Sequence, residues 1–397
     1  MQDFTERVKQ LAERYYPIGE SIRNALHIYP ETAFEEVRSS ELIAQTLSEH
    51  GIEYKIMAKT GVVGLIKGAK SGRTVLLRAD MDALKLEESH LAPLCSKRAG
   101  YMHACGHDGH VGGLIIAALI LNDLKDELSG NIKVVFQPAE ESVGGAEPMI
   151  EEGLLDNPTV DAAFALHLWG EAEYGEVWVK DGAVMAAPDE FHLRVIGKGG
   201  HAAHPQLTID PIVMSANIIN LFQQIISRRK DPLSPAVISV GALHAGEVHN
   251  IIPPYADLIG TIRTFDSSIR EMLITQMHSA IHAVTDAWGG SYELKIFKRY
   301  PAVINDSAMV EVVKAAAAKI IGAEHVKEPP AADMGGEDFA FIANAVASAY
   351  LFVGIKRGEE PILHHNPEFA FDTEILKTSS AVFAQIAIDY LSSSRSN

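Results

Sequence analysis

The sequence has few cysteines and no long hydrophobic run. Only Cys95 and Cys105 occur among 397 residues, too few for a disulfide framework in a chain of this length. The longest apolar run, residues 111–121, falls short of the roughly 18 residues of a membrane-spanning helix. The N-terminal segment alternates charged with apolar residues and lacks the apolar core of a secretion signal. We therefore expect a reducing compartment, the cytoplasm, and no membrane partner.

Positive charge is also scarce. The 34 lysines and arginines face 52 aspartates and glutamates, for a formal net charge of -18. Such a chain repels nucleic acid and anionic lipid, so we expect neither as a partner. Hydrophobic residues make up 47% of the chain and charged residues 22%, which excludes disorder as its main state. At roughly 150 residues per domain, the length indicates two domains.

Short apolar runs and helical periodicity alternate in the first half of the chain. Residues 74–77, 131–136 and 162–166 are predicted as buried strands, and a long helix is expected to begin near Gly109. This alternation predicts an α/β fold in which helices flank a mixed sheet. Carboxylates follow the first two runs, and His167 ends the third. We therefore expect polar side chains to gather at the carboxyl ends of the strands.

The pattern changes at about residue 187. Residues 190–196 alternate polar with apolar residues, as in a strand with one buried face. Helices and strands then follow in a β-α-β-β-α-β order, which predicts a smaller ferredoxin-like α+β domain. We therefore expect a catalytic metal-binding domain in two parts, 1–186 and 297–397, with an inserted lid or dimerisation domain at 187–296.

The stretch 102–110, MHACGHDGH, is dense in residues that coordinate metals. Cys105 and His107 lie one residue apart, and the neighbouring glycines allow a backbone tight enough to aim both side chains at one point. With a carboxylate, these ligands favour zinc, manganese, cobalt or nickel over calcium or magnesium. The alternative is a histidine-rich turn whose rings bond the backbone. Three further side chains are expected to support the loop: His103, Asp108 and His110.

A pair of carboxylates, Glu140 and Glu141, follows the second predicted strand. Adjacent side chains there point in different directions. We therefore expect one to bind metal and the other to act as general base on a metal-bound water. A solvated acidic turn is the alternative. His167 and the adjacent pair His364 and His365 are further candidate ligands, but each is also compatible with a core histidine.

The inserted domain holds three polar candidates. His201 lies in a glycine-rich loop that either brings its imidazole to a substrate oxyanion or is only a turn, and Asn250 and Arg263 lie beside strand sequences. An arginine is suited to hold a carboxylate through two hydrogen bonds. Taken alone, polar residues at such positions more often have a structural role than a functional one.

Eight segments occur in a fixed order: HACGHDGH, FQPAEE followed by GGA, HLW, GKGGHAAHP, NIIP, GTIRTFD, MGGEDF and HHNPEF. Together, over residues 23 to 373, they resemble the M20 metallopeptidase family. The most similar branch is the amidohydrolases of N-acyl amino acids, the group of aminoacylases, hippurate hydrolases and auxin-conjugate hydrolases. The resemblance implies a homodimer or tetramer formed through the inserted domain.

For the metal site, the resemblance implies five ligands: Cys105, His107, Glu141, His167 and His365. They would hold two divalent ions, zinc or manganese, with cobalt or nickel as further possibilities. His364 competes with His365 for the C-terminal position, and the spacing to the following proline selects His365.

The resemblance also implies the roles of residues that are not ligands. Glu140 would be the general base on a metal-bridging water, and Asp82 would orient a ligand. In the inserted domain, His201 would contact the tetrahedral intermediate. Asn250 and Arg263 would hold the substrate, Arg263 through its free carboxylate.

We therefore expect a metal-dependent amidohydrolase that converts an N-acyl-L-amino acid and water to a carboxylate and a free amino acid. A dipeptidase or carboxypeptidase of the same fold is the main alternative. A non-catalytic metal-binding or interaction protein is a second alternative. It predicts that a ligand or the base is missing, and the sequence lacks none of them.

Overall fold

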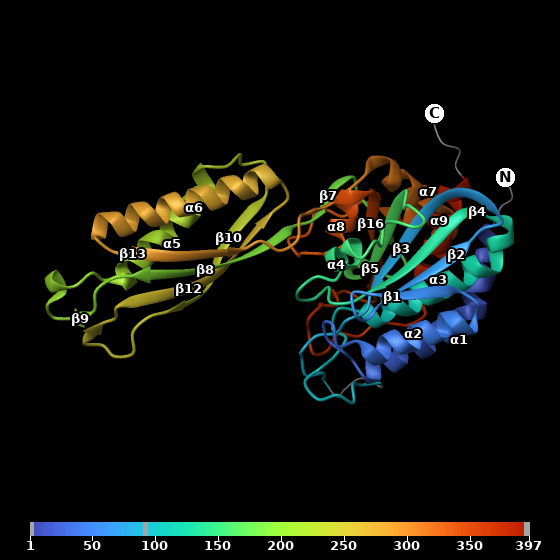
Figure 1. Cartoon of the computed structure of the whole chain (residues 1–397), viewed down its shortest axis with the longest axis horizontal. Helices are drawn as coiled ribbons and strands as arrows, with labels where there is room; N and C mark the ends of the chain where they lie inside the picture. Colours follow the sequence, from blue (N-terminus) through green and yellow to red (C-terminus); the bar gives the residue numbers. More distant parts are fainter. Residues whose placement is uncertain (1–3, 90–93, 393–397) are drawn as a thin grey trace. The chain divides into compact units, whose positions relative to one another are not determined.

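The structure, a computed structural model, describes residues 4–89 and 94–392 of the chain. It consists of two compact units, each with its own hydrophobic core (Figure 1). The first unit comprises Met1–Val184, Ile304–Ala331 and Asp338–Asn397, and the second comprises Met185–Val303 and Ala332–Glu337. The assignment of 187–296 as a lid or dimerisation domain stays a prediction.

An eight-stranded mixed sheet forms the centre of the first unit. In order across the sheet, its strands are β1 (Glu53–Met57), β2 (Gly61–Lys67), β4 (Ser129–Gln137), β3 (Lys70–Asp80), β5 (Ala162–Glu173), β16 (Ala347–Lys356), β6 (Val177–Trp178) and β15 (Val326–Lys327). β3 is parallel to β4 and β5, whereas β2 is antiparallel to β1 and β4. The predicted α/β fold with a mixed sheet is confirmed.

Helices cover this sheet (Figure 1): α1 (Thr5–Ile28), α2 (Val37–Glu49), α3 (His107–Leu124), α4 (Ala146–Glu151), α7 (Ser307–Ile321), α8 (Ala340–Ala345) and α9 (Ile375–Ser392), with short 3-10 turns at Lys125–Glu127 and Ala323–His325. Nearly all of α3 is buried, as its apolar composition predicts, because α1 and α9 pack over it. Two glycines let α1 and α3 approach closely: a Cβ at Gly19 would lie 2.6 Å from the carbonyl oxygen of Gly112. The core thus fixes α3, whose first turn begins in the candidate metal loop.

The second unit is an antiparallel sheet of four strands with two helices packed on one face. Across the sheet, its strands are β10 (Ala236–His244), β12 (Tyr255–Thr264), β8 (Ala187–Ile196) and β13 (Ser291–Phe297), and its helices are α5 (Pro211–Arg228) and α6 (Ser267–Trp288). The chain order β8-α5-β10-β12-α6-β13 is the predicted ferredoxin-like order. Shorter elements complete the chain: β9 (Gly200–His201) with β11 (Ile251–Ile252), β7 (Gly182–Met185) with β14 (Val303–Asn305), and a 3-10 turn at Pro205–Leu207.

The segment Ala332–Glu337 belongs to the second unit although it lies far from the rest of that unit in sequence. Arg263 donates from Nε to the carbonyl oxygen of Met334 at 3.0 Å. The N–H of Ala186 lies within hydrogen-bond distance of the carbonyl oxygens of Asp333, at 3.1 Å, and Gly335, at 2.8 Å. Hydrogen bonds to main-chain carbonyls do not depend on the type of side chain. The sequence therefore does not predict that residues 332–337 pack with the second unit.

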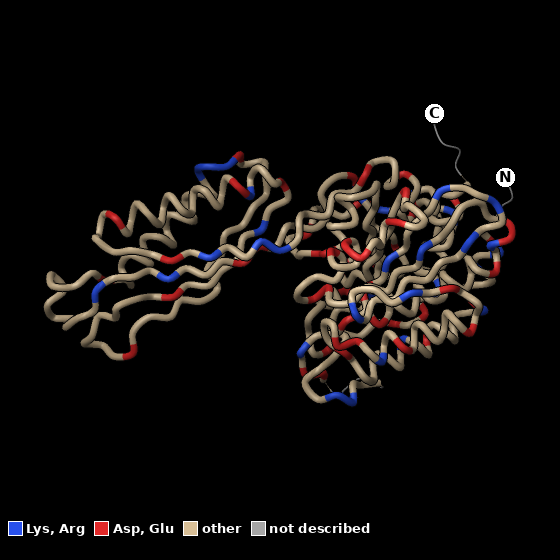
Figure 2. Tube along the Cα trace, in the orientation of Figure 1, with Lys and Arg blue, Asp and Glu red and all other residues tan. Residues whose placement is uncertain are grey.

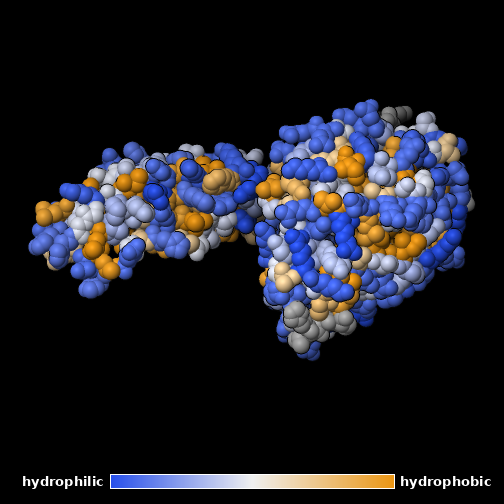
Figure 3. Space-filling model, turned by 60° about the horizontal axis from the view of Figure 1, so that its bottom comes forward, coloured by the Kyte–Doolittle hydropathy of each residue, from blue (hydrophilic) through white to orange (hydrophobic). Residues whose placement is uncertain are grey.

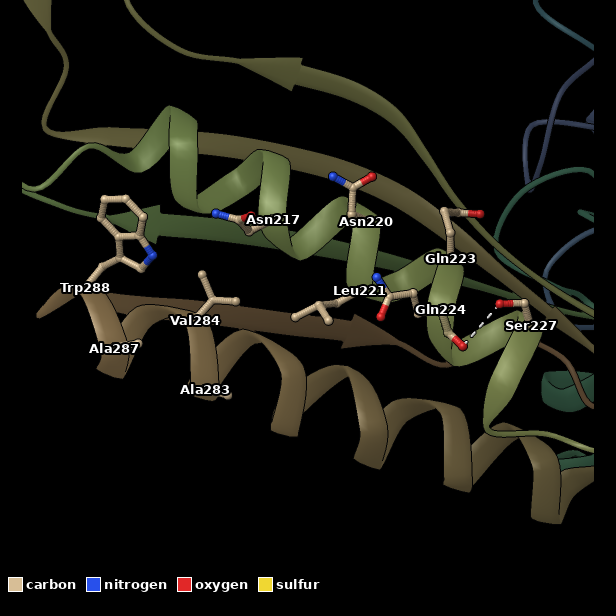
Figure 4. A pocket seen from close by; sticks show the side chains of 10 residues that line it. All are labelled: Asn217, Asn220, Leu221, Gln223, Gln224, Ser227, Ala283, Val284, Ala287 and Trp288. Carbon is tan, nitrogen blue, oxygen red and sulfur yellow. Dashed lines mark hydrogen bonds between the residues drawn. The ribbon is translucent and has the colours of Figure 1, made fainter.

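A groove runs between α5 and α6 of the second unit (Figure 4). Amide and apolar side chains line it, among them Asn217, Gln224 and Trp288, and the Ser227 hydroxyl donates to the carbonyl oxygen of Gln224 at 3.4 Å. No candidate catalytic or metal-binding residue is among the residues that line this groove.

Charged residues of both signs are spread along each unit (Figure 2). The face drawn in Figure 3 is mostly hydrophilic, with hydrophobic residues in small groups. Within residues 4–89 and 94–392, no helix combines the length and apolar character needed to cross a membrane.

Candidate active site

Gly106 sets the direction of two candidate ligands at the start of α3. Its φ is +89°, in the left-handed region that glycine adopts without strain. It separates Cys105 from His107, the first residue of α3. The ring of His167 approaches from β5, with Nε2 3.3 Å from Cys105 Sγ. Ligand atoms of Cys105, His107 and His167 lie within 4.8 Å of one another, close enough to share an ion.

His167 lies inside β5 and not at its end. The prediction of a strand that ends after Leu166 is wrong, because β5 continues to Glu173. Its pairing with β3 stops at Arg78 and Ala165, and beyond that point β16 alone among the described strands holds it. His167 therefore lies beside the end of β3, although its own strand, β5, continues to Glu173.

Main-chain carbonyls determine which nitrogen of each ring can serve as a metal ligand. Nδ1 of His107 donates to the carbonyl oxygen of Asp82 at 2.9 Å, and Nδ1 of His167 donates to that of Leu168 at 2.7 Å. Because a carbonyl only accepts, each Nε2 keeps a lone pair when the ring is neutral. Nε2 of His107 is buried and has no hydrogen-bond partner within the described part of the chain. A metal ligand requires such a nitrogen.

The site carries a surplus of negative charge. Burial alone would lower the pKa of His107, but the carboxylates of Asp80, Asp82 and Glu141 raise it to about 10. Burial, with nearby carboxylates such as Glu141, raises the pKa of the Cys105 thiol. Without a cation the site therefore retains protons. A divalent ion would neutralise the surplus and displace them, so the residues present fit a metal centre.

Asp82 fixes the turn that carries the two glutamates. Its Oδ1 accepts from the main-chain N–H of Glu140 and its Oδ2 from that of Glu141, each at 3.0 Å. Glu141 Oε1 is buried and lies 3.2 Å from His365 Nε2, but makes no hydrogen bond of good geometry to any described residue. Glu140 is also buried, and one of its oxygens lies within 4.8 Å of ligand atoms of His107 and Glu141.

The adjacent histidines His364 and His365 make different contacts. Nε2 of His364 donates to the carbonyl oxygen of Leu168 at 2.9 Å, so that nitrogen is occupied. A ring nitrogen of His365 instead lies within 4.8 Å of ligand atoms of Cys105 and Glu141. The His364 ring packs against that of His167, with ring centroids 5.1 Å apart, but of the two histidines only His365 belongs to a group of neighbouring ligand atoms among the described residues.

A buried arginine that the sequence did not single out joins the strands beside these ligands. Arg78 of β3 is fully buried and donates to Asp80 Oδ2 at 2.6 Å, Gln137 Oε1 at 2.9 Å and Asp338 Oδ1 at 2.9 Å. Asp80 Oδ1 accepts from Nδ1 of His110 at 2.5 Å. The network ties the ends of β3 and β4 to α3 and to the segment before α8. In the sequence, Arg78 lies in RADMD and Asp338 in MGGEDF, while Gln137 and His110 belong to FQPAEE and HACGHDGH.

His110 extends this network to β5. Its Nε2 accepts from the main-chain N–H of Leu168 at 2.9 Å, so Nδ1 carries the proton that is donated to Asp80. His110 forms a further group of possible ligands with Asp80 and His107, but both of its nitrogens are already bonded. It therefore supports the loop, as the sequence led us to expect.

Asp338→Asn is expected to destabilise the fold strongly. Asp338 accepts from Arg78 Nη2, Gln137 Nε2 and the main-chain N–H groups of Gly145 and Ala146, at 2.7–2.9 Å. An asparagine would turn an NH₂ group toward at least one of these donors. The free energy of unfolding should fall by roughly 3 kcal/mol or more, as when one partner of a buried ion pair is lost. Denaturant unfolding measures the change.

Asp266→Asn is the matched control for this substitution. Asp266 caps α6 at the surface, where asparagine caps a helix as well as aspartate does. We expect this variant to lose less than about 0.5 kcal/mol. Equal stability of the two variants would contradict the role given to Asp338.

A second buried cluster of charges links Asp108, in the loop of residues 102–110, to α1. His27 lies between two carboxylates, with Nδ1 2.8 Å from Asp108 Oδ2 and Nε2 3.0 Å from Glu88 Oε1. Nε of Arg23 lies 2.9 Å from the same oxygen of Asp108. Burial alone would lower the pKa of His27, but the hydrogen bonds to Asp108 and Glu88 raise it to about 9.

This cluster predicts that stability falls as the pH rises from 6.5 to about 9. The pKa of His27 in the folded chain lies above its ordinary value of 6.5. Its stabilising charge is therefore complete below pH 6.5 and lost as the pH passes through about 9, a change of roughly 3 kcal/mol. Denaturant unfolding of the wild type and of His27→Gln across this range measures the effect. The variant should decline less steeply, and parallel curves would refute the prediction.

His201, Asn250 and Arg263 belong to the second unit. The pairing of β9 with β11 brings His201 beside Asn250, where the N–H of Ala202 donates to the Asn250 carbonyl oxygen at 3.0 Å. Nδ1 of His201 accepts from the N–H of Ala203 at 3.1 Å, which leaves the proton on Nε2. Arg263 lies on β12 and is partly buried, and burial lowers its pKa.

Comparison with known proteins places the chain among metal-dependent hydrolases. The sequence profile of peptidase family M20/M25/M40 matches residues 76–389. The chain is 40% identical over 302 residues to the N-acyl-L-amino acid amidohydrolase of Geobacillus stearothermophilus, covering 76% of this chain and 81% of that one. It is 36% identical over 395 residues to thermostable carboxypeptidase 1 of Saccharolobus solfataricus, covering 98% and 99%.

A solved structure resembles nearly the whole chain. The Bacillus subtilis YXEP protein, a dinuclear metal-binding peptidase from the M20 family, matches with a TM-score of 0.82 at 34% identity. The match covers 96% of this chain and 99% of that protein. The likeness therefore extends over both units.

Proposed function

Because the chain belongs to peptidase family M20/M25/M40, we propose that it is a metal-dependent amidohydrolase that cleaves N-acyl amino acids to a carboxylate and a free amino acid. One observation carries the proposal: ligand atoms of thiol, imidazole and carboxylate groups cluster in the first unit, and two of them, His107 Nε2 and Glu141 Oε1, are buried and make no hydrogen bond of good geometry to any described residue. The likeness to an N-acyl-L-amino acid amidohydrolase supports the substrate class.

We assign five residues to two divalent metal ions: Cys105, His107, Glu141, His167 and His365. Cys105 and Glu141 each occur in two groups of neighbouring ligand atoms, and His107 occurs in three, which suits two adjacent ions. Thiolate and imidazole favour zinc, and the carboxylate also suits manganese, so one of these is the proposed metal. When bound, the ions would lower the pKa of water and polarise the amide carbonyl. His364 is left out because it belongs to none of the groups of neighbouring ligand atoms found among the described residues.

Glu140 is the proposed general base. It is not one of the five ligands, and its main chain is fixed by Asp82. Its carboxylate would take a proton from the attacking water and then deliver that proton to the leaving nitrogen. The leaving nitrogen must gain a proton to depart as an amine, and Glu140 would supply the proton that it took from the water.

Residues of the second unit would bind the substrate. Nε2–H of His201 would donate to the oxyanion of the tetrahedral intermediate. The guanidinium of Arg263 would hold the free carboxylate of the amino acid, with Asn250 as a further polar contact. We also propose that this unit serves as a lid and as the interface of a homodimer or tetramer. The two-cysteine composition favours a cytoplasmic location.

A substrate panel tests the proposal. N-acetyl and N-benzoyl amino acids are compared with dipeptides of the same C-terminal residues on the metal-loaded chain. We expect kcat/KM to be at least about tenfold higher for the acyl amino acids, a difference of roughly 1.4 kcal/mol in transition-state binding. The opposite order would favour the carboxypeptidase or dipeptidase alternative, which the likeness to thermostable carboxypeptidase 1 keeps open.

A further inference from the structure

Ala139, the residue before Glu140, has a left-handed main chain. Its φ is +62°, in a region that residues with a Cβ seldom occupy. Its N–H donates to Glu36 Oε1 at 3.0 Å, and its carbonyl oxygen accepts from the N–H of Gly144 at 2.9 Å. Such a conformation persists only where the surroundings enforce it. At Ala139 the main chain is held by Glu36 and by the N–H of Gly144.

Glu36 is fully buried and immediately precedes α2. Its second oxygen accepts from Thr60 Oγ1 at 2.8 Å. A buried carboxylate is unfavourable unless its oxygens are hydrogen-bonded, and here each oxygen receives a hydrogen bond. The side chain therefore binds the turn from a distant segment of the chain, and it is neither a proposed metal ligand nor the proposed base.

We propose that Glu36 is a positioning residue for the turn that carries Glu140 and Glu141. It holds the Ala139 peptide and thereby fixes the direction in which both glutamates leave the main chain. Asp82 binds the next two N–H groups, so three successive N–H groups are each held by a buried carboxylate. This inference rests on the proposed function, because it takes Glu140 as the base.

Two substitutions of similar size separate hydrogen bonding from packing. In Glu36→Gln the side-chain oxygen still accepts from Ala139, and the new amide can donate to Thr60. In Glu36→Met the volume is nearly kept, but nothing accepts from Ala139. We expect kcat to stay within about threefold of the wild type in Glu36→Gln and to fall at least about tenfold in Glu36→Met, because small displacements of a catalytic group reduce rates strongly. KM should be unchanged in both. Bound metal should be unchanged in Glu36→Gln and reduced in Glu36→Met, because the proposed ligand Glu141 leaves the same turn.

Hydrogen exchange of the metal-free chain gives a readout that does not depend on activity. The Ala139 N–H should exchange faster than in the wild type in Glu36→Met and at the wild-type rate in Glu36→Gln. Thr60→Val is the matched control, because it removes the other hydrogen bond of Glu36 and leaves that to Ala139. It should keep the wild-type kcat and exchange rate. If Glu36→Met does not fold, Glu36→Asp, whose shorter side chain reaches Ala139 less well, takes its place.

Wild-type kcat and exchange in Glu36→Met would overturn the inference, and so would equal losses in the glutamine and methionine variants. This failure differs from failure of the proposed function. If the proposed function were wrong, the wild-type chain itself would not hydrolyse N-acyl amino acids.

Discussion

Glu140→Gln is expected to lower kcat by about 10²–10⁴-fold, the usual contribution of a general base, while bound metal and stability stay unchanged. Glutamine keeps the shape of the side chain and the main-chain hydrogen bond to Asp82, but it cannot take a proton from water. Turnover of an N-acetyl amino acid and elemental analysis of the same sample measure both quantities.

Glu147→Gln is the matched control for this variant. Glu147 lies in α4, close to Glu140 in sequence, and is exposed. We expect its kcat to equal that of the wild type. Near-normal turnover in Glu140→Gln would rule out Glu140 as the base.

Cys105→Ala is expected to release at least one of the two ions. Ligand atoms of Cys105 lie near those of His107 and His167 in one group and near those of Glu141 and His365 in another, so its loss affects both. Metal affinity should fall by more than the 10–100-fold typical of residues that only support a ligand, and hydrolysis should fall with it. Dialysis against a metal buffer followed by elemental analysis gives the affinity.

The other cysteine supplies the control. Cys95→Ala removes a thiol whose Sγ lies 3.8 Å from the carbonyl oxygen of Ser89, outside the groups of possible ligands found among the described residues. This variant should keep both ions. Two tightly bound ions in Cys105→Ala would show that the centre of the metal site is elsewhere.

Local sequence patterns pointed to segments of the candidate site, and the family resemblance supplied the rest of the proposed ligand set. Strand-like runs ended near Asp82 and Glu140, and the structure brings the turns that follow β3 and β4 into hydrogen-bond contact. The glycine before His107 predicted a tight backbone, and its positive φ accounts for it. The end of β5 was misplaced, because the pattern did not show that β16 continues to pair beyond the last partner in β3.

The supporting residues could not be predicted in the same way. Arg78 and Asp338 meet across 260 positions of sequence, and Glu36 reaches Ala139 across 103. Contacts between residues so far apart leave no periodic signal. A buried charge in a sequence is also indistinguishable from an exposed one until the fold is known. The packing of Ala332–Glu337 with the second unit could not be predicted either, because main-chain carbonyls accept the hydrogen bonds that hold this segment.

The most direct test of the account counts metal ions and turnover in the same sample. The wild-type chain is stripped with a chelator and reloaded stepwise with zinc or manganese, and hydrolysis of an N-acetyl amino acid is measured at each step. A two-ion site predicts no hydrolysis in the stripped chain and full activity at two ions per chain. Full hydrolysis by the metal-free chain would contradict it.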